Sequence, residues 1–130
     1  MAGLKAPPFS FDRKGGIMTD AEFIALALSL PETELSTNHG RPALCVRKKI
    51  FAGPGEGRGG VAALKLSREQ QDIFCEVEPA IFRPDPSHWG RAGWTSFILE
   101  AADKATAKSA LVAAWRNIAP KTLAAKHPDL

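Results

Sequence analysis

Turn-forming residues divide the middle of this chain into segments that suit β-strands and are too short for helices. The pairs His39-Gly40 and Lys48-Lys49 separate short runs of β-type residues, and a glycine-rich stretch at 53–60 follows them. Runs of this length bounded by turn signals are typical of strands joined as hairpins. The glycine-rich stretch is too long for a tight two-residue turn and is expected to project into solvent as a flexible loop. We predict an antiparallel meander with strands at Thr33–Asn38, Ala43–Arg47, Ile50–Gly53 and Val61–Leu66.

Helix signals lie on both sides of the meander. Thr19 followed by Glu22 is a capping-box pattern, and Ser67 and Asp103 are suited to cap two later helices. Pro120 suits the first position of a short final helix. The predicted helices cover residues 19–30, 68–77, 103–118 and 120–126.

Between the second and third helices the composition predicts a loop and then a strand. Residues 80–94 are dense in proline, glycine and tryptophan, which favours an ordered loop without regular structure. Trp94–Glu100 alternates like a strand and is apolar on both faces, so we expect it to be buried on both faces and central in the sheet.

These elements predict one α+β domain over residues 18–130, with an N-terminal helix, a β-meander and C-terminal helices packed on an antiparallel sheet. A chain of 130 residues fits one domain, and 45% apolar and 24% charged residues are ordinary globular values. Residues 1–17 show no periodicity and are expected to be a disordered leader or a tag remnant.

Charge is unevenly distributed along the chain. The formal net charge is +3, but residues 39–68 carry seven basic residues against the single acid Glu56, which gives that segment +6. Acidic segments flank it, so the pattern excludes a protein that is basic all over and permits one basic face.

Cysteine usage and hydropathy point to the cytoplasm. No run approaches the roughly 18 apolar residues of a membrane-spanning helix. Cys45 and Cys75 belong to no paired motif, and the amino end lacks the apolar core of a secretory signal. We expect a soluble, cytoplasmic protein with reduced thiols and no membrane partner.

Six short pieces of sequence in a fixed order resemble the YjbR/MmcQ family of small bacterial proteins, over about residues 18–126. The pieces are Leu30-Pro31-Glu32, His39-Gly40-Arg41-Pro42-Ala43, Ile50-Phe51-Ala52, Leu64-Lys65-Leu66, His88-Trp89-Gly90-Arg91-Ala92-Gly93-Trp94 and Ala119-Pro120-Lys121. The resemblance implies an α+β fold similar to frataxin-like and double-wing DNA-binding domains, and a DNA-binding label that rests on fold analogy. It implies no catalytic residues and no cofactor.

The basic segment is the first candidate site. A hairpin turn and the glycine-rich loop are expected to form two adjacent protrusions that contact the phosphates of double-stranded DNA. The alternative is that these cations only keep one end of the sheet soluble and block edge pairing. The residues concerned are Arg41, Arg47, Lys48, Lys49 and Arg58.

The loop around His88–Trp94 is the second candidate site, for an unknown small ligand or protein partner. Tryptophan and arginine can stack on bases and pair with phosphates. The alternative is a packed loop in which both tryptophans are core anchors. The residues of this pocket or supplementary surface are His39, Arg83, His88, Trp89, Arg91 and Trp94.

Catalytic and metal functions have less support. Cys45 and Cys75 suit buried positions, and no residues show the spacing of a zinc site, so we expect no enzyme activity, no metal and no cofactor. The frataxin-like analogy raises an iron site, which we rank below nucleic acid, at Asp20, Glu22, Glu32 and Glu34.

Overall fold

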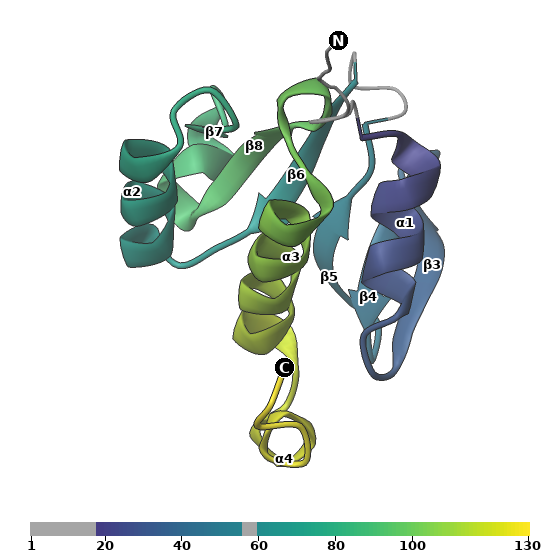
Figure 1. The fold of residues 1–130 in the computed structure, drawn as a ribbon. Helices are drawn as coiled ribbons and strands as arrows, with labels where there is room; N and C mark the ends of the chain where they lie inside the picture. The colour runs from purple at the N-terminus through teal and green to yellow at the C-terminus, as the bar shows by residue number, and fades with distance from the viewer. Residues whose placement is uncertain (1–17, 56–59) are drawn as a thin grey trace, which may run out of the picture.

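A six-stranded antiparallel sheet with helices packed on it forms the fold, in a computed structural model that describes residues 18–55 and 60–130 (Figure 1). Strand order is β3-β4-β5-β6-β8-β7. The strands are β3 (Thr33–Asn38), β4 (Arg41–Val46), β5 (Lys49–Gly53), β6 (Val61–Lys65), β7 (Phe82–Pro84) and β8 (Trp94–Ile98). The helices described are α1 (Asp20–Leu28), α2 (Arg68–Val77), α3 (Lys104–Ile118) and α4 (Lys121–Ala125), with 3-10 turns η1 (His88–Ala92) and η2 (Leu99–Ala101). The predicted α+β class is confirmed.

Side-chain caps start three of the helices where the sequence predicted. The Thr19 hydroxyl accepts from the Glu22 amide at 3.1 Å while Glu22 bonds back, which completes the capping box of α1. Ser67 does the same for α2, and a carboxylate oxygen of Asp103 accepts from the Thr106 amide at 2.7 Å to cap α3. α4 differs slightly, because Pro120 occupies the position before the first helical residue.

Two tight turns join the first three strands. His39 and Gly40 have φ of 52° and 77°, and Arg47 and Lys48 have φ of 48° and 70°. Left-handed values at both central residues are the mark of a two-residue type I′ turn, whose twist matches that of the strands. The second turn therefore lies one residue before the predicted Lys48-Lys49 pair, and Lys49 pairs with Val46 as the first residue of β5.

Two predictions about the region after α2 are wrong. β7 is a short edge strand inside the predicted loop, where Pro84 is tolerated because an edge strand needs fewer amide donors. β8 is second from that edge and alternates, with Thr95 and Phe97 buried and Trp94 partly exposed. The face of β8 that carries Trp94 is therefore only half-buried.

α1 and α3 lie on the same side of the sheet and cover its core face, while α2 packs beside β7 (Figure 1). The rings of Phe23, Phe97 and Phe82 follow one another with centroid separations of 5.8 and 5.3 Å. Each fully buried ring of this kind contributes about 1.5–3 kcal/mol. Among residues 18–55 and 60–130, no helix has the length and apolar character needed to cross a membrane.

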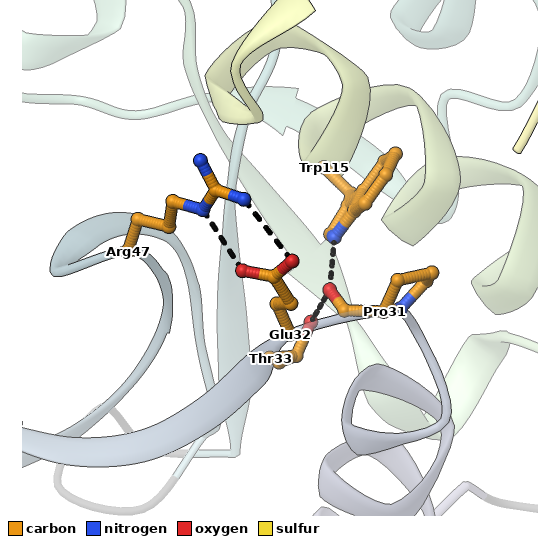
Figure 2. A network of polar contacts seen from close by, with 5 residues as sticks. All are labelled: Pro31, Glu32, Thr33, Arg47 and Trp115. Atoms are coloured by element: carbon orange, nitrogen blue, oxygen red, sulfur yellow. Dashed lines mark hydrogen bonds and ion pairs between the residues drawn. The ribbon is translucent and has the colours of Figure 1, made fainter. Parts of the chain in front are cut away.

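The start of β3 is fastened from two sides (Figure 2). The indole nitrogen of Trp115 in α3 donates to the Pro31 carbonyl at 2.9 Å, and the Thr33 hydroxyl donates to the same oxygen at 3.4 Å. The guanidinium of Arg47 donates from Nε and Nη2 to the two carboxylate oxygens of Glu32, at 2.8 and 3.1 Å. These contacts fix the connection between α1 and the sheet.

Substituting Trp115→Phe should lower the free energy of unfolding by about 1–3 kcal/mol, because the Pro31 carbonyl loses its best donor and the smaller phenyl ring fills less of the buried site. Urea denaturation measures the change. Trp94→Phe is the matched control, since the Trp94 indole nitrogen makes no hydrogen bond with the described residues, and its loss should be smaller. Equal losses in the two variants would contradict a role for the Trp115–Pro31 bond.

Candidate functional site

Strand topology separates the cations that the sequence grouped together. The turn at Arg47–Lys48 lies where β5 begins, and Pro54 and Gly55 follow the other end of β5, about 13 Å away over four residue steps of strand. Arg41 begins β4 and therefore lies at the far end from that turn. Arg58 lies outside the described residues. Because successive turns of a meander fall at opposite ends of the sheet, the described flanks of the glycine-rich stretch lie at the opposite end from the Arg47–Lys48 turn, and the predicted loop protrusion itself falls outside the described residues.

Arg47 is occupied by an internal ion pair. Its two bonds to Glu32 hold the pKa of that carboxyl below its ordinary value and raise the pKa of Arg47, although both side chains are about half exposed, at 49% and 47%. Lys48 and Lys49 are exposed and form no ion pair with a described acid. We call Arg47, Lys48 and Lys49 the hairpin tip, and only its two lysines have free charges.

The loop from Asp85 to Trp94 is ordered by close contacts between backbone segments. A Cβ on Gly90 would lie 2.2 Å from the Asp85 carbonyl oxygen, so only glycine allows this approach. Gly93 has φ of 103°, and a Cβ there would lie 1.9 Å from the Leu66 carbonyl oxygen. The Ser87 hydroxyl accepts from the Trp89 amide at 3.2 Å and caps η1. The loop packs through its backbone rather than through large side chains.

One buried amide ties this loop to α2. Gln71 is 2% exposed, and its Nε2 donates to the carbonyls of Gly90 and Trp94, both at 3.0 Å. The buried Thr95 hydroxyl donates to the Gly93 carbonyl at 2.9 Å. Because buried polar groups are costly when unpaired, these bonds define one geometry for the loop. Gln71 is not among the residues predicted from the sequence, because a glutamine in an amphipathic helix gives no distinguishing signal.

Two further cations point at the same turn. The Lys65 ammonium donates to the Ala92 carbonyl, and Arg68 Nη1 donates to the Arg91 carbonyl at 3.2 Å. The Arg91 side chain is itself exposed. Lys65 and Arg68 belong to the basic segment 39–68 and were counted in its net charge. Their contact with η1 could not be predicted from the sequence and is seen only in the fold.

The aromatic residues of the loop differ from one another in burial. Trp89 is 56% exposed, and its ring centroid lies 4.7 Å from that of His88. The alternative that both tryptophans are core anchors is therefore wrong for Trp89. Trp94 is half-buried and pairs in register with Lys65, on the sheet face that also carries Arg83. We call Lys65, Arg68, His88, Trp89 and Arg91 the loop site.

His39 does not belong to the loop site. Its turn lies at the start of β4, at the end of the sheet where β6 begins, whereas η1 lies at the end where β6 finishes. The expected neighbourhood of His39 and the His88–Trp94 loop is wrong.

Several residues considered for catalysis or metal binding are hydrogen-bonded elsewhere or are thiols with a raised pKa. Burial raises the pKa of the Cys45 thiol, with a further increase from Glu34, and burial also raises that of Cys75. A carboxylate oxygen of Asp20 accepts from the Gly55 amide at 2.6 Å. Glu32 is paired with Arg47, and no three His, Cys, Asp or Glu residues among those described gather as a metal site.

Comparison with known proteins identifies relatives by family and by fold. A family model described as YjbR matches residues 28–117. The chain is similar to Deinococcus radiodurans protein DR2400, whose crystal structure has a domain described as DUF419, with a TM-score of 0.68 and 13% identity over 82% of each chain. At that identity the likeness concerns the fold alone. No curated protein matches the chain.

Substituting Gly93→Ala should destabilise the protein more than Gly40→Ala. Both glycines have positive φ, which costs an alanine roughly 1–2 kcal/mol, but a Cβ at Gly40 meets nothing within 4 Å while one at Gly93 collides with Leu66. We expect an additional loss of about 1–3 kcal/mol for Gly93→Ala, measured by thermal or urea unfolding. Similar losses would show that the close approach at Gly93 is unimportant.

Alkylation of Cys45 and Cys75 should be slower than that of an unstructured cysteine at about pH 8, because a raised pKa lowers the thiolate fraction. The rate should rise with pH and reach the free-thiol rate in denaturant, as followed by mass spectrometry. Rapid alkylation of either folded thiol at neutral pH would contradict this assignment.

Proposed function

The chain belongs to the YjbR family, and from that premise we propose that it is a non-enzymatic nucleic-acid-binding module that contacts phosphates through the loop site. The observation that supports this proposal is the convergence of Lys65, Arg68 and Arg91 on one ordered turn. Cations held in this way neutralise neighbouring phosphates and release counterions.

The order of the loop strengthens the proposal. Lys65 and Arg68 are each held by a backbone carbonyl, so they lose less conformational freedom when a phosphate binds. The Arg91 side chain is exposed, and the turn that carries it is held in place two residues later, where the Gly93 backbone packs against Leu66. A guanidinium can pair with a phosphate through two donors.

The hairpin tip is a second, weaker phosphate contact in this proposal. Lys48 and Lys49 lie at the same end of the sheet as η1, because β5 begins where β6 finishes. Arg47 contributes little, since releasing it from Glu32 would break two charged hydrogen bonds. Arg41 lies at the other end and takes no part.

The exposed indole of Trp89 favours a second candidate function, a module for an aromatic ligand or a protein partner. Salt separates the two functions. Affinity that depends on several phosphate contacts falls steeply as salt rises, whereas affinity from aromatic contact changes little. The raised thiol pKa values support a binding role over catalysis by cysteine.

We expect a random-sequence DNA duplex to bind with an affinity that falls steeply between about 50 and 200 mM salt. Arg91→Ala should weaken binding about threefold to tenfold and reduce the salt slope by about one, as measured by fluorescence anisotropy. Lys48→Ala with Lys49→Ala tests the hairpin tip in the same titration.

Lys108→Ala is the matched control, because it removes one exposed charge from α3 without touching η1. If it weakened binding as much as Arg91→Ala, net charge rather than the loop site would explain the affinity. Absence of binding to both duplex and single-stranded DNA at low salt would overturn the proposed function.

A further inference from the structure

We propose that Trp89 is a stacking platform for an unpaired base, so that the loop site prefers single-stranded nucleic acid to continuous duplex. The inference rests on the proposed function and adds the class of nucleic acid. It depends on three features: the exposure of the indole, the fixed backbone beneath it, and the cations beside it.

The indole is presented to solvent rather than left there by a mobile segment. Trp89 is 56% exposed, yet its amide is bonded to the Ser87 hydroxyl and the next residue, Gly90, is buried against Asp85. The Gly90 amide also donates to the Ser87 carbonyl at 3.0 Å. A large ring on an ordered backbone loses little entropy on binding, which is how aromatic residues act in recognition surfaces.

His88 supports the ring without covering it. The two ring centroids lie 4.7 Å apart with an angle of 34° between the planes, and more than half of the Trp89 surface remains accessible. Trp115, by contrast, is fully buried in the core. Covering an exposed tryptophan with a flat apolar surface is favourable because it removes apolar area from water. Every nucleobase offers such a surface.

The neighbouring cations make the surface suitable for a nucleotide rather than for an apolar ligand. Arg68 and Lys65 donate to carbonyls only two and three residues after Trp89, and Arg91 lies in the same 3-10 turn. Single-strand binding sites combine these two elements, an aromatic platform for bases and cations for the backbone. In a continuous duplex the bases are stacked on each other, and reaching their faces requires unstacking.

Charge also distinguishes the surfaces on either side of the loop site. Beyond Arg68, α2 carries Glu69, Asp72 and Glu76 and no cation, so phosphates are repelled on that side. The sheet face across β8 carries a further exposed cation, Arg83, on β7. Phosphates of a bound strand are therefore favoured on the sheet face that carries Arg83 and disfavoured along the exposed surface of α2.

The test compares three probes with wild type, Trp89→Leu and Trp89→Phe. The probes are an oligothymidylate of about ten nucleotides, an abasic strand with the same number of phosphates, and a continuous mixed-sequence duplex. Stacking is worth about 1–3 kcal/mol per base, so Trp89→Leu should lose about 5- to 150-fold in affinity for oligothymidylate. Its affinity for the abasic strand and the duplex should change less than about twofold, and Trp89→Phe should fall between wild type and Trp89→Leu.

Ile73→Ser is the matched control, since Ile73 is 61% exposed on α2 and should not affect any probe. If Trp89→Leu leaves oligothymidylate binding unchanged, or weakens all probes equally, the stacking inference is overturned. In that case an Arg91→Ala variant that still weakens binding leaves the proposed function standing. If wild type binds none of the probes at low salt, the proposed function and the inference both fail.

Discussion

In an antiparallel meander each turn lies at the opposite end of the sheet from the previous one, and this constraint decides which residues of the chain can act together. The hairpin tip and η1 fall at one end, while the His39 turn and the residues Pro54 and Gly55 after β5 fall at the other. A continuous basic segment in the sequence is thereby divided between two ends of the fold. The surface charge of the protein follows from strand topology more than from the number of cations.

The η1 loop is ordered by hydrogen bonds to a buried amide and by glycines that have no Cβ. A large apolar side chain does not anchor it in the core. The buried Gln71 amide is satisfied by the carbonyls of Gly90 and Trp94, which also accept from the Gly93 and Asp85 amides, and Gly90 and Gly93 allow two backbones to approach closely. Because the loop does not need a large apolar anchor, Trp89 can remain outside. The exposed ring and the buried amide are thus parts of one arrangement.

Local signals predicted most of the fold, because caps, turn residues and strand runs act over a few positions. Thr19 with Glu22, Ser67 and Asp103 all cap helices as their patterns indicated. The candidate site was harder to predict, since Lys65 meets Ala92 and Gln71 meets Gly90 only through long-range pairing. The short β7 was missed because proline and glycine dominate its surroundings and only an edge position tolerates Pro84.

The three tryptophans occupy three depths, with Trp115 in the core, Trp94 half-buried on β8 and Trp89 largely in solvent. The chain contains no tyrosine, so its ultraviolet emission comes almost entirely from these indoles. Each reports a different layer, and single-tryptophan versions of the chain would distinguish release of the η1 loop from melting of the core. Intrinsic tryptophan fluorescence can therefore show which part of the structure unfolds first.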